Sequence, residues 1–195
     1  MNQTKTALQT YWAHHQSEID WLFDQSFPFA LSLQAALKRF GRLTDNQFSA
    51  LRKCMARGAE DAARIAAPKV AVDISAIETC FAKAKADGAK YPKLRLADFV
   101  FSPASINGKN AGSIYVKSGE TYLGKVQEGK LFRSRDCTAD QEAAIVEAAA
   151  DPESAAIAYG KKYGRCSICA RDLSDADSVA RGMGAVCAKR FGWSK

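Results

Sequence analysis

The chain has 195 residues, of which 47% are hydrophobic and 25% charged. This composition is typical of one folded domain or two small ones, and it excludes a wholly disordered chain. The N-terminal residues lack a basic start followed by an apolar core, and no run reaches the ~18 apolar residues of a membrane span. We therefore expect a cytoplasmic protein with no membrane partner.

The formal net charge of +7 is unevenly distributed along the chain. Residues 1–88 are nearly balanced, with eleven Lys and Arg against nine Asp and Glu. Residues 89–136 carry nine against four and residues 161–195 carry eight against three, whereas residues 137–160 carry five acidic and no basic side chains. Such segregation is typical of a surface that meets phosphate groups.

Residues 1–88 are predicted to form a helical region. Apolar residues recur at helical spacing over 5–24, and a second helix begins at Pro28 and ends at Gly41. The stretch Thr44-Asp45-Asn46-Gln47 is a capping box that begins a third helix, so the second and third helices form a helical hairpin. A further capping box at 75–78 begins a helix that Gly88 ends.

Residues 89–160 are predicted to form a small antiparallel sheet followed by acidic helices. The segments "KLRLADFVFSPA", "GSIYVKSG", "TYLGKVQEG" and "KLFRSRD" are rich in β-branched and aromatic residues and are separated by turn residues. The pattern indicates about four strands. Together with the helical region it predicts an α+β fold.

The alternation of side chains in this sheet suggests a binding surface. Tyr115 and Lys117 share one face of their strand, and Arg133 and Arg135 lie on the same face as Leu131. An exposed aromatic residue with basic neighbours is typical of a platform on which single-stranded bases stack. A sheet with a merely solvated outer face is the alternative.

No catalytic motif is found in the sequence. It contains no G-x-G-x-x-G, no Walker loop, no H-E-x-x-H and no G-x-S-x-G, and its two histidines are adjacent, at positions 14 and 15. We therefore expect a protein that is not an enzyme.

The C-terminal stretch "CSICARDLSDADSVARGMGAVC" has the spacing of a metal-binding module. Cys166 and Cys169 form a Cys-x2-Cys pair, and Cys187 follows after seventeen intervening residues. In a zinc knuckle of this type two thiolates bind one ion, and backbone N–H groups hydrogen-bond to the sulfurs. The spacing predicts a treble-clef-like zinc module over residues 161–195, packed on the preceding segment.

A structural zinc site has four protein ligands, so one remains to be found. Cys137 is our first candidate, because sulfur suits a closed structural zinc. A carboxylate of Asp175 or Asp177, and a ligand from solvent or a partner, are the alternatives, as is a module without metal. If the fourth ligand were water, the zinc could activate it, and metal-dependent hydrolysis would be the chemistry to test.

The C-terminal motif resembles that of small uncharacterised proteins encoded mainly by bacteriophages and prophages. The matching residues are Cys166, Cys169, Ala170, Arg171, Leu173, Ser174, Asp175, Ser178, Gly182, Gly184 and Cys187. The resemblance extends over about residues 94–193, and the helical hairpin is similar to hairpins in the same proteins. It implies a phage protein with a zinc-finger-like tail, associated with nucleic acid by analogy. These proteins also have three cysteines in the motif, and many have Gly and Pro where this chain has Ala170 and Ala185.

These observations predict a metal-stabilised nucleic-acid-binding phage accessory protein, DNA or RNA being left open. The finger would present Arg165, Arg171, Arg181, Lys189 and Arg190, with Trp193 or Phe191 to stack on bases; the sheet would add Tyr115, Lys117, Arg133 and Arg135. The alternative is a phage-encoded inhibitor or modulator of a host enzyme, such as a polymerase or a defence protein, that binds its target through protein–protein contacts.

Overall fold

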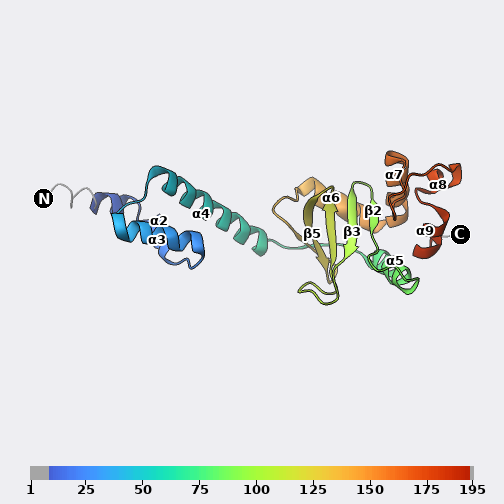
Figure 1. Cartoon of the computed structure of the whole chain (residues 1–195), viewed down its shortest axis with the longest axis horizontal. Helices are drawn as coiled ribbons and strands as arrows, with labels where there is room; N and C mark the ends of the chain where they lie inside the picture. Colours follow the sequence, from blue (N-terminus) through green and yellow to red (C-terminus); the bar gives the residue numbers. More distant parts are fainter. Residues whose placement is uncertain (1–8, 194–195) are drawn as a thin grey trace. The chain divides into compact units, whose positions relative to one another are not determined.

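A computed structural model describes residues 9–193, which divide into two compact units at the junction of residues 67 and 68 (Figure 1). The boundary lies between Ala67 and Pro68 and not after residue 88, where the sequence placed it. The reason is that helix α5 (Ser75–Ala86) buries Ile77 and Phe81 in the core of the second unit. Among residues 9–193, none of the helices has the length and apolar character that crossing a membrane requires.

The first unit is helical. Residues 9–14 are helical and are followed by α2 (Gln16–Phe23), α3 (Pro28–Phe40) and α4 (Asp45–Ala66). The capping box at Thr44 is confirmed, because Thr44 accepts from the Gln47 backbone N–H while the Gln47 side chain accepts from the Thr44 N–H. The capping box predicted at 75–78 was wrong, because Ser75 is already the first residue of its helix and its N–H donates to Asp73. The core of this unit consists of Ile19, Leu22, Ala30, Leu33, Leu37, Leu43, Phe48 and Leu51.

The second unit contains a six-stranded antiparallel sheet, and the predicted α+β class is confirmed. Its strands are β1 (Val70–Ala71), β2 (Leu94–Leu96), β3 (Phe99–Pro103), β4 (Ile114–Ser118), β5 (Thr121–Gln127) and β6 (Lys130–Arg133), in the order β1-β6-β5-β4-β3-β2. The sheet exceeds the predicted four strands for two reasons. The segment "KLRLADFVFSPA" is a hairpin with Ala97 at a φ of 50°, and the short β1 pairs with β6.

Helices cover one face of this sheet and leave the other to solvent. Besides α5, helix α6 (Ala139–Ala150) covers this face, lying behind the strands in the view of Figure 1. Ile145 of α6 belongs to the same buried cluster as the inward-facing strand residues Phe101 and Val116. Helix α7 (Pro152–Tyr163) lies beside the edge strand β2, where the Ala97 N–H donates to the Ala155 carbonyl at 2.9 Å. The chain ends with the short helices α8 (Ala176–Arg181) and α9 (Ala185–Phe191).

Candidate functional site

The structure brings three cysteines of the second unit together. The Sγ atoms of Cys166, Cys169 and Cys187 all lie within 4.8 Å of one another, a grouping that can hold a metal ion. The first two lie in the turn that follows α7, and Cys187 lies in the first turn of α9. Cys166 is buried, Cys187 half-buried and Cys169 exposed, so one side of the cluster faces solvent.

Local backbone bonds shape the turn that carries the first two cysteines. Gly164 ends α7 with a left-handed φ of 63°, and Arg165 forms a bridge with Asp172 that closes the turn. Inside it, the Cys166 N–H donates to the Arg171 carbonyl and the Ala170 N–H donates to the Cys166 carbonyl. Ala170 has a φ of 60°, a conformation that glycine adopts at lower cost.

The same turn is attached to the sheet through Arg95. The Arg95 backbone N–H donates to the Ser167 carbonyl at 2.8 Å, and its Nη1 donates to the Ile168 carbonyl at 2.7 Å. Because β2 is an edge strand, the cysteine turn satisfies backbone groups that would otherwise be unpaired. The cysteine cluster is therefore part of the second unit and not an independent module, and Met183, Ala188 and Phe191 of the same segment lie in that unit's core.

A contact between two glycines joins α7 to the end of α8. A Cβ built on Gly160 would lie 2.1 Å from the Gly182 Cα, and one built on Gly182 would lie 2.5 Å from the Ile157 Cα. Gly182 also has a φ of 70° and ends α8. Its carbonyl accepts from the Ser167 N–H at 3.1 Å, so this close approach fixes the Cys-x2-Cys turn. Gly184, the other glycine of the C-terminal motif, has an ordinary φ of −67°.

Hydrogen bonds to sulfur favour a thiolate at the centre of the cluster. The pKa of Cys166 is lowered, chiefly because the Cys187 thiol donates to it, with further help from the backbone N–H groups of Ile168, Cys169 and Gly184. The pKa of Cys187 is raised, first because its thiol donates a hydrogen bond to the Cys166 sulfur and then because its side chain is partly buried. The backbone thus supports negative charge on sulfur, as a metal–thiolate site requires.

The predicted fourth ligand, Cys137, does not lie with the other three. It follows β6 and precedes α6, and its Sγ donates to the Thr138 carbonyl at 3.6 Å. Three strands separate β6 from β2, which places these strands roughly 19 Å apart at ~4.8 Å per strand. The pKa of Cys137 is raised, first by burial and then by the nearby Glu142, as for a core thiol.

The predicted carboxylates are not ligands either. The side chain of Asp175 accepts from the Ser178 N–H at 2.8 Å and caps α8, and Asp177 lies within that helix. Among residues 9–193 no further Cys, His, Asp or Glu joins the three sulfurs. If the cluster holds a metal ion with four ligands, the fourth would have to come from solvent, from a partner or from outside residues 9–193.

Several finger residues that were predicted to contact phosphate instead interact with carboxylates of the chain itself. Arg165 Nε pairs with Asp172 at 3.1 Å and Arg190 Nε pairs with Asp87 at 2.6 Å. Arg181 contributes to lowering the pKa of the Asp175 carboxyl, after the hydrogen bonds that Asp175 accepts from Ser178 and Asp177. The side chains of Arg171 and Lys189 are exposed.

The two finger residues that were predicted to stack on bases differ in their burial. The prediction for Phe191 was wrong, because its side chain is buried in the core, where its ring centroid lies 6.3 Å from that of Phe81. Trp193 is half-buried and lies 6.4 Å from Phe191, so it packs on the edge of the same core.

The solvent side of the sheet gathers aromatic and basic side chains. This outer face consists of Tyr115, Lys117, Tyr122, Lys125 and Phe132, contributed by three neighbouring strands. Tyr115 pairs in register with Lys125, which pairs with Phe132, and Lys117 pairs with Tyr122. The Tyr115 and Tyr122 rings meet edge to face at 5.9 Å, and Lys125 Nζ lies 5.6 Å from the Phe132 centroid.

A hydrogen-bond network orders the centre of the outer face. Lys125 Nζ donates to Asn110 Oδ1 at 2.7 Å and to Gln127 Oε1 at 2.8 Å, while Asn110 Nδ2 donates to the Tyr115 hydroxyl at 3.0 Å. The rings and the ammonium group are thus held in place before any ligand arrives, which reduces the entropy lost on binding.

The sheet arginines that the sequence assigned to binding lie elsewhere. Arg133 shares the inward face with Leu131, as the alternation indicated, but that face carries α6, and Arg133 Nη1 pairs with Glu142 at 3.2 Å. Arg135 lies in the exposed turn beyond β6. Tyr115 and Lys117 do lie on the outer face.

Sequence reasoning missed Tyr122, Lys125, Arg95 and Gly160. A β-bulge between Val116 and Lys117 breaks the period of two along β5, so Tyr122 and Lys125 share a face although three positions separate them. The alternation in "LRL" could have indicated Arg95, since it places the Arg95 side chain on the other face of the strand from the two buried leucines. Nothing local indicates that Gly160 meets Gly182.

Comparison with known families gives a match to the C-terminal segment. A family model described as a family of unknown function, DUF6011, matches residues 156–192. No curated protein and no solved structure matches the chain. The matched segment contains the three clustered cysteines together with Gly160 and Gly182, so the cysteine turn and its glycine contact lie in the part of the chain that is similar to this family.

Proposed function

We propose that this chain is a zinc-stabilised nucleic-acid-binding protein, a phage accessory protein that acts without catalysis in the host cytoplasm. The observation that carries the proposal is the outer face of the sheet. Its three aromatic rings lie beside two lysines, and Tyr122 and Phe132 are 40% and 38% exposed. Rings and cations in such proximity are the elements that bind bases and phosphates of a single strand.

The charge of the sheet supports the same conclusion. Strands β2 to β6 contain no Asp or Glu, whereas Lys117, Lys125 and Lys130 alternate with their buried residues. Of the other two basic residues in these strands, Arg95 bonds to the Ile168 carbonyl and Arg133 pairs with Glu142. A phosphate backbone crossing the outer face would therefore meet cations and no strand carboxylate. Because every base has a flat face that can stack, we expect tolerance of sequence and a preference for single strands over duplexes.

The zinc in this proposal has a structural role. Zinc is favoured over harder metals because all three clustered ligands are thiolates. It would hold the Cys166–Cys169 turn to the start of α9, and so keep residues 164–192 folded on β2. The exposed side of Cys169 is where water or a partner would supply the fourth ligand.

The test is fluorescence anisotropy of labelled single- and double-stranded DNA and RNA with the full chain. Binding should be strongest to single strands and should weaken as salt rises, because lysines displace counterions from phosphate. We expect Tyr122→Ala and Phe132→Ala each to weaken binding by about 5- to 150-fold, the equivalent of ~1–3 kcal/mol of stacking per base.

Tyr163→Ala is the matched control for these variants. Tyr163 is also an exposed tyrosine, but it lies on α7, where its hydroxyl bonds to Asp98. Its replacement should leave the affinity unchanged. No binding by the wild-type chain at low salt, or equal affinities for the two outer-face variants and the wild type, would refute the proposal.

A second candidate function is supported by the first unit. Phe23, Phe29, Leu31 and Phe40 are exposed on α2 and α3, and exposed apolar side chains of this size are typical of protein-binding surfaces. This favours a protein that binds and modulates a host enzyme. A host protein retained in stoichiometric amount on the immobilised chain after nuclease treatment, and lost with Phe40→Ser, would support this second function.

A further inference from the structure

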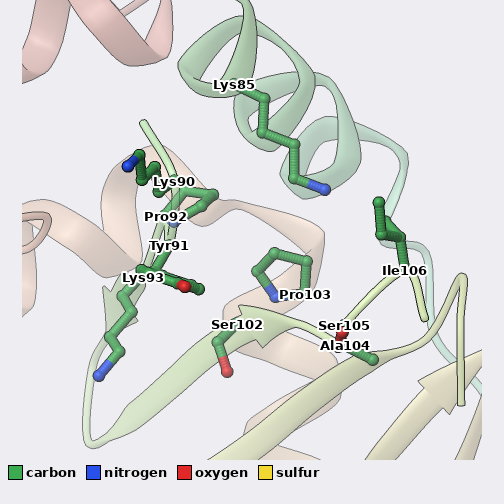
Figure 2. A pocket seen from close by; sticks show the side chains of 10 residues that line it. All are labelled: Lys85, Lys90, Tyr91, Pro92, Lys93, Ser102, Pro103, Ala104, Ser105 and Ile106. Atoms are coloured by element: carbon green, nitrogen blue, oxygen red, sulfur yellow. The ribbon is translucent and has the colours of Figure 1, made fainter. Parts of the chain in front are cut away.

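A pocket of ≈ 470 Å³ lies at the end of β3, and none of the three clustered cysteines lines it. It is lined by the end of α5, by the loop that precedes β2, and by residues 102–106 at the end of β3 and beyond (Figure 2). Its volume is within the range of about 300–1,000 Å³ that small-molecule sites occupy.

The walls of this pocket are largely apolar. Tyr91 and Ile106 lie on opposite sides of it, with the Pro103 ring between them (Figure 2). Tyr91 is 87% and Ile106 77% exposed, although both are large apolar side chains. An aromatic ring, a proline ring and an aliphatic side chain around one space suit a flat, apolar ligand group.

Three lysines give the same pocket a positive charge. Lys85 extends from α5 toward the space above Pro103, while Lys90 and Lys93 flank Tyr91 in sequence and extend outward at the rim (Figure 2). No carboxylate of residues 9–193 forms an ion pair with any of the three. They differ in this respect from Arg165 and Arg190 of the finger, and their charge is available to an anion.

The pocket adjoins the outer face of the sheet. Ser102 lines the pocket and is the register partner of Tyr115. The pocket therefore lies at the β3 end of a row that continues across the sheet through Tyr115 and Lys125 to Phe132. A single strand of nucleic acid that lies along this row of side chains would place its next nucleotide in the pocket.

We infer that this pocket binds one nucleotide, with its base against Tyr91 and Pro103 and its phosphate at Lys85. A nucleotide combines the two properties that the pocket matches, a flat apolar ring system and a negative charge. The hydroxyls of Ser102 and Ser105, which also line the pocket, are available to the polar edge of the base. The choice of a nucleotide among aromatic anions rests on the proposed nucleic-acid function.

The experiment is an NMR titration of the isotope-labelled full chain with adenosine 5′-monophosphate, and separately with inorganic phosphate. We expect saturable shifts at Tyr91, Ala104 and Ile106 with the nucleotide, and weaker binding of phosphate alone. Tyr91→Ala and Lys85→Ala should each weaken nucleotide binding at least fivefold, which is about 1 kcal/mol. Lys161→Ala, an exposed lysine of α7, is the control that should change nothing.

The outcomes separate this inference from the proposed function. Nucleotide binding that is absent, or that is unchanged in Tyr91→Ala, would overturn the pocket assignment even if oligonucleotides bind the outer face. Equal affinity for phosphate and nucleotide would overturn the role of the base. The mononucleotide needs no contact with Tyr122 or Phe132. If the wild-type chain binds it and both Tyr91→Ala and Lys85→Ala lose this binding, the pocket assignment is supported even if oligonucleotides do not bind the outer face.

Discussion

Replacing Gly182 with alanine is expected to destabilise the second unit by about 2–5 kcal/mol. A left-handed φ costs a non-glycine residue ~1–2 kcal/mol, and forcing a methyl group into a packed contact costs ~1–3 kcal/mol more. The added Cβ would lie 2.5 Å from the Ile157 Cα and 2.6 Å from the Ala156 carbonyl oxygen, and these backbone atoms cannot move away without shifting α7.

Two neighbouring glycines provide controls. Gly164 also has a left-handed φ, of 63°, but no atom lies within 4 Å of a Cβ there, so Gly164→Ala should cost only ~1–2 kcal/mol. Gly184 has neither constraint, and Gly184→Ala should change stability by less than about 0.5 kcal/mol. Hydrogen exchange of peptides from residues 156–192 across a urea series measures all three. Equal costs for Gly182→Ala and Gly164→Ala would show that the contact with α7 contributes nothing.

Replacing Cys187 with serine is expected to lower the affinity for zinc by more than about 100-fold. Loss of a residue that only orients a ligand commonly costs 10- to 100-fold, so loss of one of three thiolates should cost more. Since metal binding and folding are coupled in small zinc modules, residues 164–192 should also lose their exchange protection. The same result is expected for Cys166→Ser.

Cys137→Ser is the matched control, because it removes a buried thiol at the far side of the sheet. It should retain the zinc content and chelator resistance of the wild type, although replacing a core sulfur with a hydroxyl lowers stability somewhat. Metal content after dialysis, together with competition by a chromogenic chelator, gives the comparison. If Cys137→Ser lost as much zinc as Cys187→Ser, the three-cysteine assignment would be wrong.

Much of the fold could be predicted from the sequence because its signals are local. The capping box at Thr44 and Gln47 is confirmed, since a capping box involves only four consecutive residues. The sheet and its antiparallel class were also predictable from short apolar segments and turn residues. The domain boundary was not, because α5 is amphipathic whichever unit it packs against, and only its contact with the sheet assigns it to the second unit.

In the candidate site too, local features could be predicted from the sequence and non-local contacts could not. The Cys-x2-Cys spacing identifies two candidate metal ligands because a single turn determines it, and Cys187, the third, lies in the first turn of α9. The location of Cys137 depends on the order of strands in the sheet, which spacing along the chain does not reveal. Likewise, the pairing of Arg190 with Asp87 joins residues that are 103 positions apart. Non-local contacts of this kind decide which charges remain available.

X-ray absorption at the zinc edge of the purified full chain tests the metal assignment most directly. We predict three sulfur neighbours at about 2.3 Å and one lighter neighbour, oxygen or nitrogen, at about 2.0–2.2 Å. The spectrum should be the same for Cys137→Ser. A shell of four sulfurs in the wild-type chain, or purified protein that contains no zinc and takes up none, would contradict the metal assignment.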